Sequence, residues 1–189
     1  MRKITSKRKE EKKQKRNQMI GSIALIVILF SSIIGYSIGG VSKKNKILYK
    51  GHEFVEEDGF WFVEIGNFEF SFRYNPGEVG EINSELNLLN SYSSKPLYIS
   101  SEDIESESEI YRNLLAQNNL VLRMQIACLE GEECASSELP VKTCADNFIL
   151  IREAEVTEVR QEENCVFIEG KSEDLAKITD SFLLKVIGL

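Results

Sequence analysis

The chain has 189 residues and a formal net charge of −7, from 23 basic and 30 acidic residues. The charges are divided unevenly, because residues 1–18 hold nine basic and two acidic residues, whereas residues 42–189 hold 14 basic and 28 acidic, a net of −14. An acidic balance of this size argues against nucleic-acid binding by the second part. The acidic balance is compatible with a surface that keeps the domain soluble, with loosely bound cations or with a basic partner. The 148 residues of this part suffice for one domain with its own core.

Residues 1–18 contain almost no apolar side chain, so we expect a disordered tail. A basic run can indicate nucleic acid, but one that adjoins an apolar stretch more often sets membrane orientation and attracts anionic lipid. The sequence therefore predicts a cytoplasmic tail beside the lipid bilayer.

Residues 19–41 follow without a single charge. As a helix they would extend ~34 Å, enough to cross a hydrocarbon core of ~30 Å. The apolar run is too long for a usual cleaved signal peptide, and no A-x-A-like cleavage site follows it. We predict an uncleaved signal anchor, with the rest of the chain outside the cytoplasm.

Small residues recur at four-residue spacing in this span, at Ser31, Gly35 and Gly39. Such a stripe lets two helices approach closely, which would give a homodimer through helix–helix packing. Small residues are also common in transmembrane helices for no specific reason, so both interpretations stay open.

Residues 42–46 predict a short stalk, and residues 47–189 a single extracytoplasmic domain. A β-meander is expected first, with strands over 47–55, interrupted at Gly51, then over 60–65 and 68–74. The Asp58-Gly59 pair is typical of a tight hairpin turn. The aromatic face of the last strand suggests core packing more strongly than a ligand platform.

After a poorly patterned stretch over 80–94, where apolar spacing suggests a short helix, we expect a strand over 96–100 and a helix over 101–119. Ser106 and Glu109 have the spacing of a capping box. The acidic run at the start of this helix favours a solvated helix start complementing the helix dipole, because the run lacks the glycine of a calcium loop.

Three further strand segments are expected, over 120–128, over 148–152 and over 156–169, the last as a hairpin or two successive strands. The near-continuous apolarity of 148–152 predicts a central strand. Ser172 is expected to cap a last amphipathic helix that ends at Gly188.

All four cysteines lie in the predicted outer domain. Two structural disulfides in an oxidising compartment are expected, with Cys128 bonded to Cys134 and Cys144 to Cys165. A four-thiolate zinc site and free or regulated thiols are the alternatives, although no C-x2-C knuckle is present. The disulfide across the longer loop would contribute ~3 kcal/mol.

Motifs for catalysis are scarce. The single histidine, His52, sits beside Gly51 and is expected to be a surface or turn residue. No G-x-S-x-G, phosphate-binding loop or H-E-x-x-H occurs, and Asp146 and the other carboxylates have no predictable pairing. We therefore expect no enzyme, no cofactor and no metal.

These patterns together predict an N-terminal transmembrane helix plus one extracytoplasmic α+β domain, made of a β-meander, a mixed sheet and two packing helices. The expected function is that of a membrane-tethered module that binds or helps to assemble an unidentified envelope protein. A thiol-redox or metal-dependent function that uses the four cysteines is the alternative.

Overall fold

The computed structural model describes residues 15–29, 44–134 and 136–189. It divides the chain into two compact units, residues 1–43 and residues 44–189. In the first unit, residues 15–29 are helical, and their apolar side chains are exposed. Among the described residues, no helix combines the length and the apolar character needed to cross a membrane. The second half of the predicted span, with Ser31, Gly35 and Gly39, lies outside the described residues.

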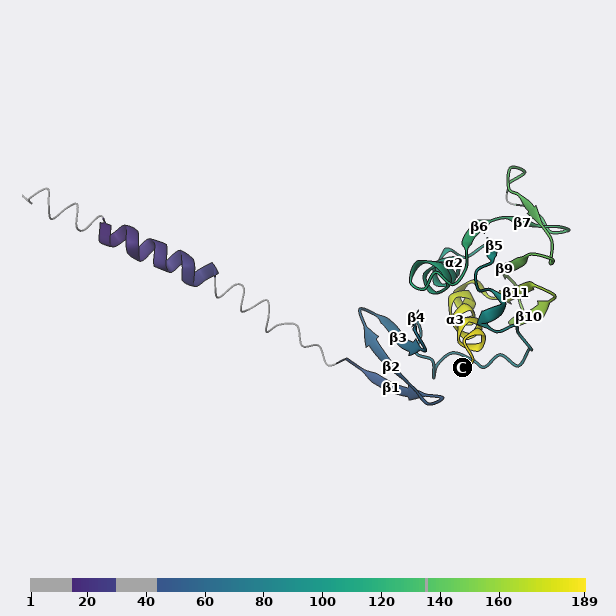
Figure 1. Ribbon diagram of the computed structural model, residues 1–189, viewed down its shortest axis with the longest axis horizontal. Helices are drawn as coiled ribbons and strands as arrows, with labels where there is room; N and C mark the ends of the chain where they lie inside the picture. The colour runs from purple at the N-terminus through teal and green to yellow at the C-terminus, as the bar shows by residue number, and fades with distance from the viewer. Residues whose placement is uncertain (1–14, 30–43, 135) are drawn as a thin grey trace, which may run out of the picture. The chain divides into compact units, whose positions relative to one another are not determined.

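The second unit begins with the predicted β-meander, an antiparallel sheet in the order β1-β2-β3-β4 (Figure 1). Its strands are β1 (Lys46–Tyr49), β2 (His52–Glu57), β3 (Phe60–Ile65) and β4 (Phe68–Phe72). The prediction of one interrupted strand over 47–55 is wrong, because Lys50 and Gly51 form a two-residue turn with φ of 47° and 87°. Both angles are positive, as a type I′ hairpin turn requires, so this segment folds back on itself. The predicted turn at Asp58-Gly59 is confirmed, with φ of 51° and 82°.

A mixed five-stranded sheet follows, in the order β10-β11-β9-β5-β6. Its strands are β5 (Pro96–Ser101), β6 (Arg123–Ile126), β9 (Asn147–Glu153), β10 (Glu158–Glu162) and β11 (Cys165–Gly170). Within this sheet only the pair β10–β11 is antiparallel, and it forms the predicted hairpin. Strand β9 occupies the central position, as expected. The strand predicted over 120–128 is shorter than expected, since β6 ends at Ile126 and the next strand begins at Cys128.

Two disulfides support the outer face of this sheet, with the pairing expected from the sequence. Cys144 bonds Cys165 at the start of β11, and Cys128 bonds Cys134. The segment between β6 and β9 carries the parallel strand pair β7 (Cys128–Leu129) and β8 (Val141–Lys142). Side chains from it and from the outer face of the sheet, such as Phe148, form a small separate core.

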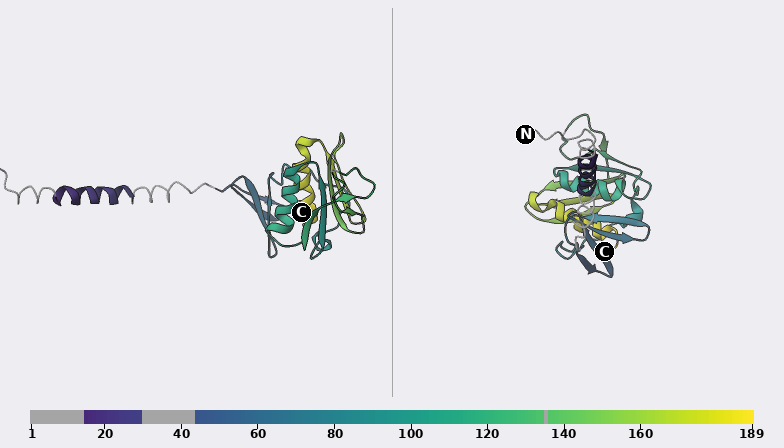
Figure 2. Two further views of the ribbon diagram at one scale, coloured as in Figure 1. Left: turned by 90° about the horizontal axis from the view of Figure 1, so that it is seen from above. Right: turned by 90° about the vertical axis from the view of Figure 1, so that its left-hand side faces the viewer.

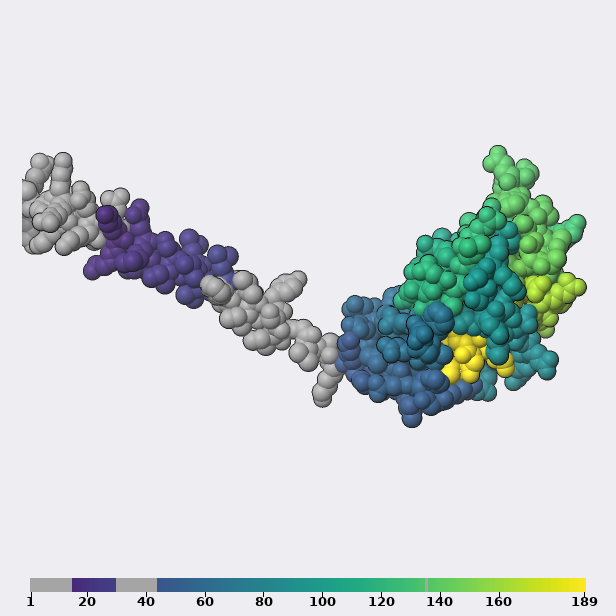
Figure 3. Space-filling model, in the orientation of Figure 1, coloured from purple at the N-terminus to yellow at the C-terminus, as the bar shows by residue number. Residues whose placement is uncertain are grey.

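The helices form a layer between the two sheets (Figure 2). They are α2 (Ile104–Tyr111), continued by the π-helical turn η2 (Arg112–Ala116), and α3 (Leu175–Val186). The main core joins the inner face of the meander, both helices and the facing side of the mixed sheet. Because α3 packs on both sides, ten of its twelve residues are buried, and little of the yellow C-terminal helix reaches the surface in Figure 3.

The helix starts differ from those predicted. Asp103 caps α2, and its carboxylate accepts the backbone N–H of Ser106 at 2.8 Å, so the expected Ser106–Glu109 capping box is wrong. Ser172 begins a 3-10 turn, η3 (Ser172–Asp174), instead of capping α3. The predicted end at Gly188 is confirmed, because its φ of 92° lets the chain close the helix with a hydrogen bond from Leu189 N to Leu184 O.

Residues 73–95, here called the strap, connect β4 to β5. The strap contains only the 3-10 turn η1 (Leu89–Ser91), so the short helix expected within 80–94 is largely absent. It runs beside the edge strand β10, where Asn87 N donates to the Gln161 side chain at 2.7 Å. Covering an edge with a loop in this way protects it from pairing with other chains.

Candidate functional site

A cavity of about 350 Å³ lies where the strap passes α3 and the start of β10. This cavity is here called the groove. Its floor is apolar and contains Ile82 of the strap, Val159 of β10 and Ile178 of α3. Small-molecule and side-chain sites in proteins commonly combine such a floor with a few polar groups. The groove is therefore the candidate binding site.

Gly170 at the end of β11 allows α3 to lie close to the sheet at this point. A Cβ at this position would overlap Cδ1 of Ile178. The glycine thereby leaves room for an isoleucine that forms part of the groove floor.

The mouth of the groove is mainly acidic. Glu81, Glu158 and Asp174 line it together with a single cation, Lys177. Glu81 also binds Lys50 in the β1–β2 turn at 3.2 Å, beside a second cavity of about 190 Å³ that shares strap residues with the groove. The mouth thus carries more negative than positive charge, in keeping with the acidic balance of the domain.

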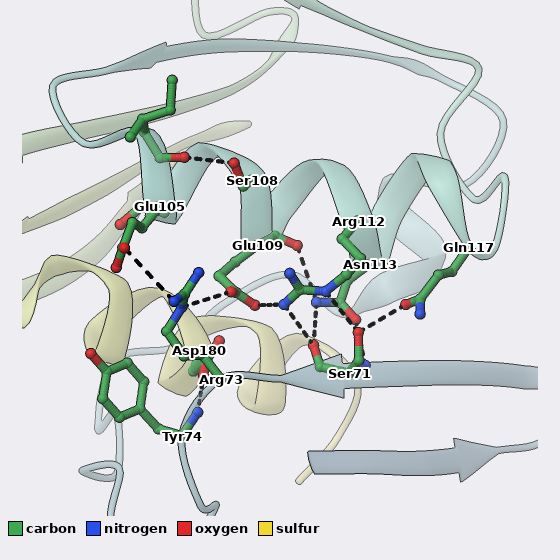
Figure 4. Close-up of polar contacts among 12 residues, drawn as sticks. Ser71, Arg73, Tyr74, Glu105, Ser108, Glu109, Arg112, Asn113, Gln117 and Asp180 are labelled. Atoms are coloured by element: carbon green, nitrogen blue, oxygen red, sulfur yellow. Dashed lines mark hydrogen bonds and ion pairs between the residues drawn. The ribbon is translucent and has the colours of Figure 1, made fainter. Parts of the chain in front are cut away.

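A second polar feature is buried between the meander and the helices (Figure 4). It is here called the acid cluster, and it consists of Glu109 of α2, Asp180 of α3, Arg112 of η2, and Arg73 and Tyr74 of the strap. The side chains of Glu109 and Asp180 are both 0% exposed. The sequence interpretation of Glu109 as part of a solvated helix start is therefore wrong.

Both arginines of the acid cluster bind Glu109. Arg112 pairs with one carboxylate oxygen, and Arg73 Nε lies 3.4 Å from the other. Arg73 also lies 3.7 Å from Glu105, and Arg112 stacks on the Phe60 ring at 4.3 Å from its centroid. Burial raises the pKa of Glu109, and the positive charges of the two arginines oppose that shift.

Asp180 has no such cation. Its Oδ2 accepts the backbone N–H of Tyr74 at 2.9 Å, and its Oδ1 has no hydrogen-bond partner among the described residues. Burial, followed by the negative charge of Glu109, raises the pKa of Asp180 to about 8. Burial also raises the pKa of the Tyr74 phenol.

Two asparagines beside the acid cluster pair with the free edge of β4. The side-chain oxygen of Asn113 accepts the backbone N–H of Ser71, and its side-chain nitrogen donates to the backbone oxygen of Ser71, at 2.8 Å each. Asn118 binds the backbone of Glu69 in the same way, at 3.1 and 2.7 Å. In an α-helix, residues five apart point about 140° away from each other. The hydrogen bond from Gln117 N to Arg112 O marks the π turn, whose i→i+5 pattern brings such residues to one side.

The other residues singled out by the sequence are not brought together into one site. All four cysteines are disulfide-bonded. His52 begins β2 and is half-buried, and Asp146 pairs with Lys142 at 3.7 Å. Among the described residues, no group of three or more metal-ligating side chains lies close enough to hold an ion. Sequence reasoning missed the groove and the acid cluster because both depend on residues from distant segments.

Comparisons of the chain with protein families, with curated proteins and with solved structures find no match.

Proposed function

We propose that this chain is a single-pass membrane protein whose residues 44–189 bind a segment of an envelope protein through the groove. The proposed occupant is a segment that presents an apolar side chain flanked by Lys or Arg. The observation that carries this proposal is the combination of an apolar floor with an acidic mouth. The binding module acts in assembly and not in catalysis.

The membrane anchor in this proposal is residues 19–41. It is supported by the uncharged run of 23 residues and by the nine basic residues that precede it. We place the N-terminus in the cytoplasm and residues 44–189 outside it, where an oxidising compartment suits two disulfides. The test is protease treatment of intact and broken spheroplasts. Cleavage of residues 44–189 only after the membrane is broken would refute this orientation.

The membrane helix could also form a homodimer through Ser31, Gly35 and Gly39. Replacing Gly35 and Gly39 with Leu is expected to leave membrane insertion unchanged and to abolish the dimer band after cross-linking in membranes. A dimer that survives both substitutions does not depend on this stripe.

The groove is tested by site-specific photo-crosslinking in native membranes. A photoreactive residue at Asn83, on the exposed rim, is expected to form a defined adduct with a partner protein. Glu158→Lys should reduce this adduct at least tenfold, because it replaces an attractive charge by a repulsive one. Glu138→Lys, an equally exposed change outside the groove, is the matched control and should leave the adduct unchanged.

Two outcomes would refute the groove as the binding site. One is that a photoreactive residue at Ser137, which does not line the groove, gives the same adduct in the same yield as one at Asn83. The other is an Asn83 adduct whose yield does not respond to Glu158→Lys.

A thiol-redox or metal-dependent function is not proposed as a second candidate. Metal ligation would require free thiolates, whereas all four sulfurs are in disulfide bonds, and no observation favours redox cycling of these disulfides.

A further inference from the structure

Asp180 is the carboxylate of the acid cluster that neither arginine binds, because both arginines bind Glu109. Two cations, Arg73 and Arg112, face two carboxylates, Glu109 and Glu105, with which they pair. Asp180 forms no ion pair among the described residues, and its side chain is fully buried. An ionised carboxylate in that position would be a buried charge that no arginine contacts directly, since Arg73 and Arg112 both bind Glu109, and such a charge is costly in a protein interior.

The position of Asp180 makes its protonation state important for the attachment of the meander. It lies on α3, and its Oδ2 accepts the backbone N–H of Tyr74, two residues after β4 ends. The charged and titratable groups that face it come from each element packed around it: Glu109 and Arg112 from α2 and η2, and Arg73 and Tyr74 from the strap. Asp180 therefore sits at the joint where the meander meets the helices.

We infer that a single proton on Asp180 controls how tightly the meander is attached to the helices. While Asp180 is neutral, it adds no unpaired charge to the joint, and the Tyr74 N–H bond keeps the end of β4 on α3. Loss of the proton places an unpaired charge beside Glu109, and water reaches it only if the joint opens. Asp180 does not line the groove, and this inference does not depend on the proposed binding function.

The direction of the pH dependence follows from linkage. The attached state has the raised pKa of about 8, whereas a solvated aspartate has a pKa of about 3.9. Attachment is therefore fully stabilised below pH ~4. It weakens up to about tenfold for each unit of pH between ~4 and ~8, and it changes little above pH ~8.

The experiment is amide hydrogen exchange on the full-length protein in detergent between pH 5 and pH 9, with each rate divided by its intrinsic rate. Amides of β4 should lose up to about tenfold of their protection for each pH unit, while amides of β9 should not. Asp180→Asn, which keeps the acceptor for Tyr74 N–H, should abolish this slope. Asp146→Asn, a neutralised surface aspartate, is the control and should retain it.

A second measurement does not rely on the variant. In the wild-type protein with isotope-labelled aspartate, infrared spectroscopy should show a protonated carboxyl band at pH 7 that disappears as the pH is raised past the pKa. Absence of this band at pH 7 would overturn the inference. So would a β4 slope that persists in Asp180→Asn, or one that is equal in β9.

Discussion

Two buried acids in one cluster are expected to respond in opposite directions to the same chemical change. Glu109 and Asp180 are both 0% exposed and both belong to the helix layer. Glu109→Gln removes the carboxylate that binds Arg73 and Arg112, and leaves two cations facing each other. Asp180→Asn removes a group whose ionised form has no partner. At pH 8 we expect the first to destabilise the fold and the second to stabilise it.

The magnitudes follow from the contacts. Breaking a buried ion pair by removing one partner costs about 3–5 kcal/mol, and the value here belongs at the low end because the Arg112 and Arg73 side chains are 22% and 35% exposed. For Asp180, the difference between an ordinary pKa of 3.8 and one of about 8 corresponds to at most about 6 kcal/mol. Because the folded-state pKa is raised, the gain from Asp180→Asn is absent below pH ~4, grows to pH ~8 and is then constant.

The two substitutions should also be coupled. In Glu109→Gln the arginines lose their counter-ion, so they favour an ionised Asp180 and partly recover an ion pair. The double variant loses both acids and leaves the arginines with only Glu105. The double variant should therefore be less stable than the sum of the two single changes in the free energy of unfolding predicts, by about 1–3 kcal/mol.

The assay is urea unfolding of the full-length protein in detergent, followed by tryptophan emission at pH 5 and pH 8. Trp61 is the only tryptophan, and it packs against the core from β3, so its emission reports on the meander. Two results would refute the assignment of the charge to Glu109 and of the proton to Asp180. One is that both substitutions change the free energy of unfolding in the same direction at pH 8. The other is that Asp180→Asn stabilises the protein as much at pH 5 as at pH 8.

Three further predictions concern the supports of the fold. Asn113→Ala leaves two backbone groups of the β4 edge without partners and should lower the free energy of unfolding by about 2 kcal/mol in the same assay. Gly170→Ala should cost about 1–3 kcal/mol by displacing Ile178, and should weaken the groove cross-link even where the protein remains folded. Replacing Cys144 and Cys165 together with Ala should cost about 3 kcal/mol, measured against wild type under non-reducing conditions.

The elements that the sequence predicts well are those with local causes. Asp58-Gly59 has the side chains that a tight turn needs, and the alternation over 68–72 correctly predicts a strand. Its burial departs from the alternation, because Phe68 is exposed and Ser71 on the polar face is buried beside Asn113. The cysteine pairing is also predictable, because Cys144 precedes the strand expected over 148–152 and Cys165 lies within the segment expected over 156–169. In the sheet those strands are neighbours, and Cys165 lies opposite Phe148.

The remaining features depend on contacts that no local pattern reveals. Lys50 is an uncommon residue for the first position of a hairpin turn, so Gly51 alone suggested an interruption instead of a reversal. Glu109 resembles its acidic neighbours in the sequence, and the i,i+3 spacing to Arg112 is equally common on exposed helices. Its second partner is Arg73, which is 36 residues earlier in the chain. The groove likewise requires the strap to pass α3, and the strap has no periodic pattern.

The structure also limits how far the meander can separate when Asp180 loses its proton. The end of β4 is held by the Tyr74 bond to Asp180, but its middle is held by the amides of Asn113 and Asn118, which do not titrate. Ionisation of Asp180 therefore removes support from one end of the strand only. The loss of amide protection with pH should be largest at Tyr74 and should decrease toward Glu69. A loss that is uniform along β4 would mean that the meander separates as a rigid unit and that the two asparagines contribute little to its attachment.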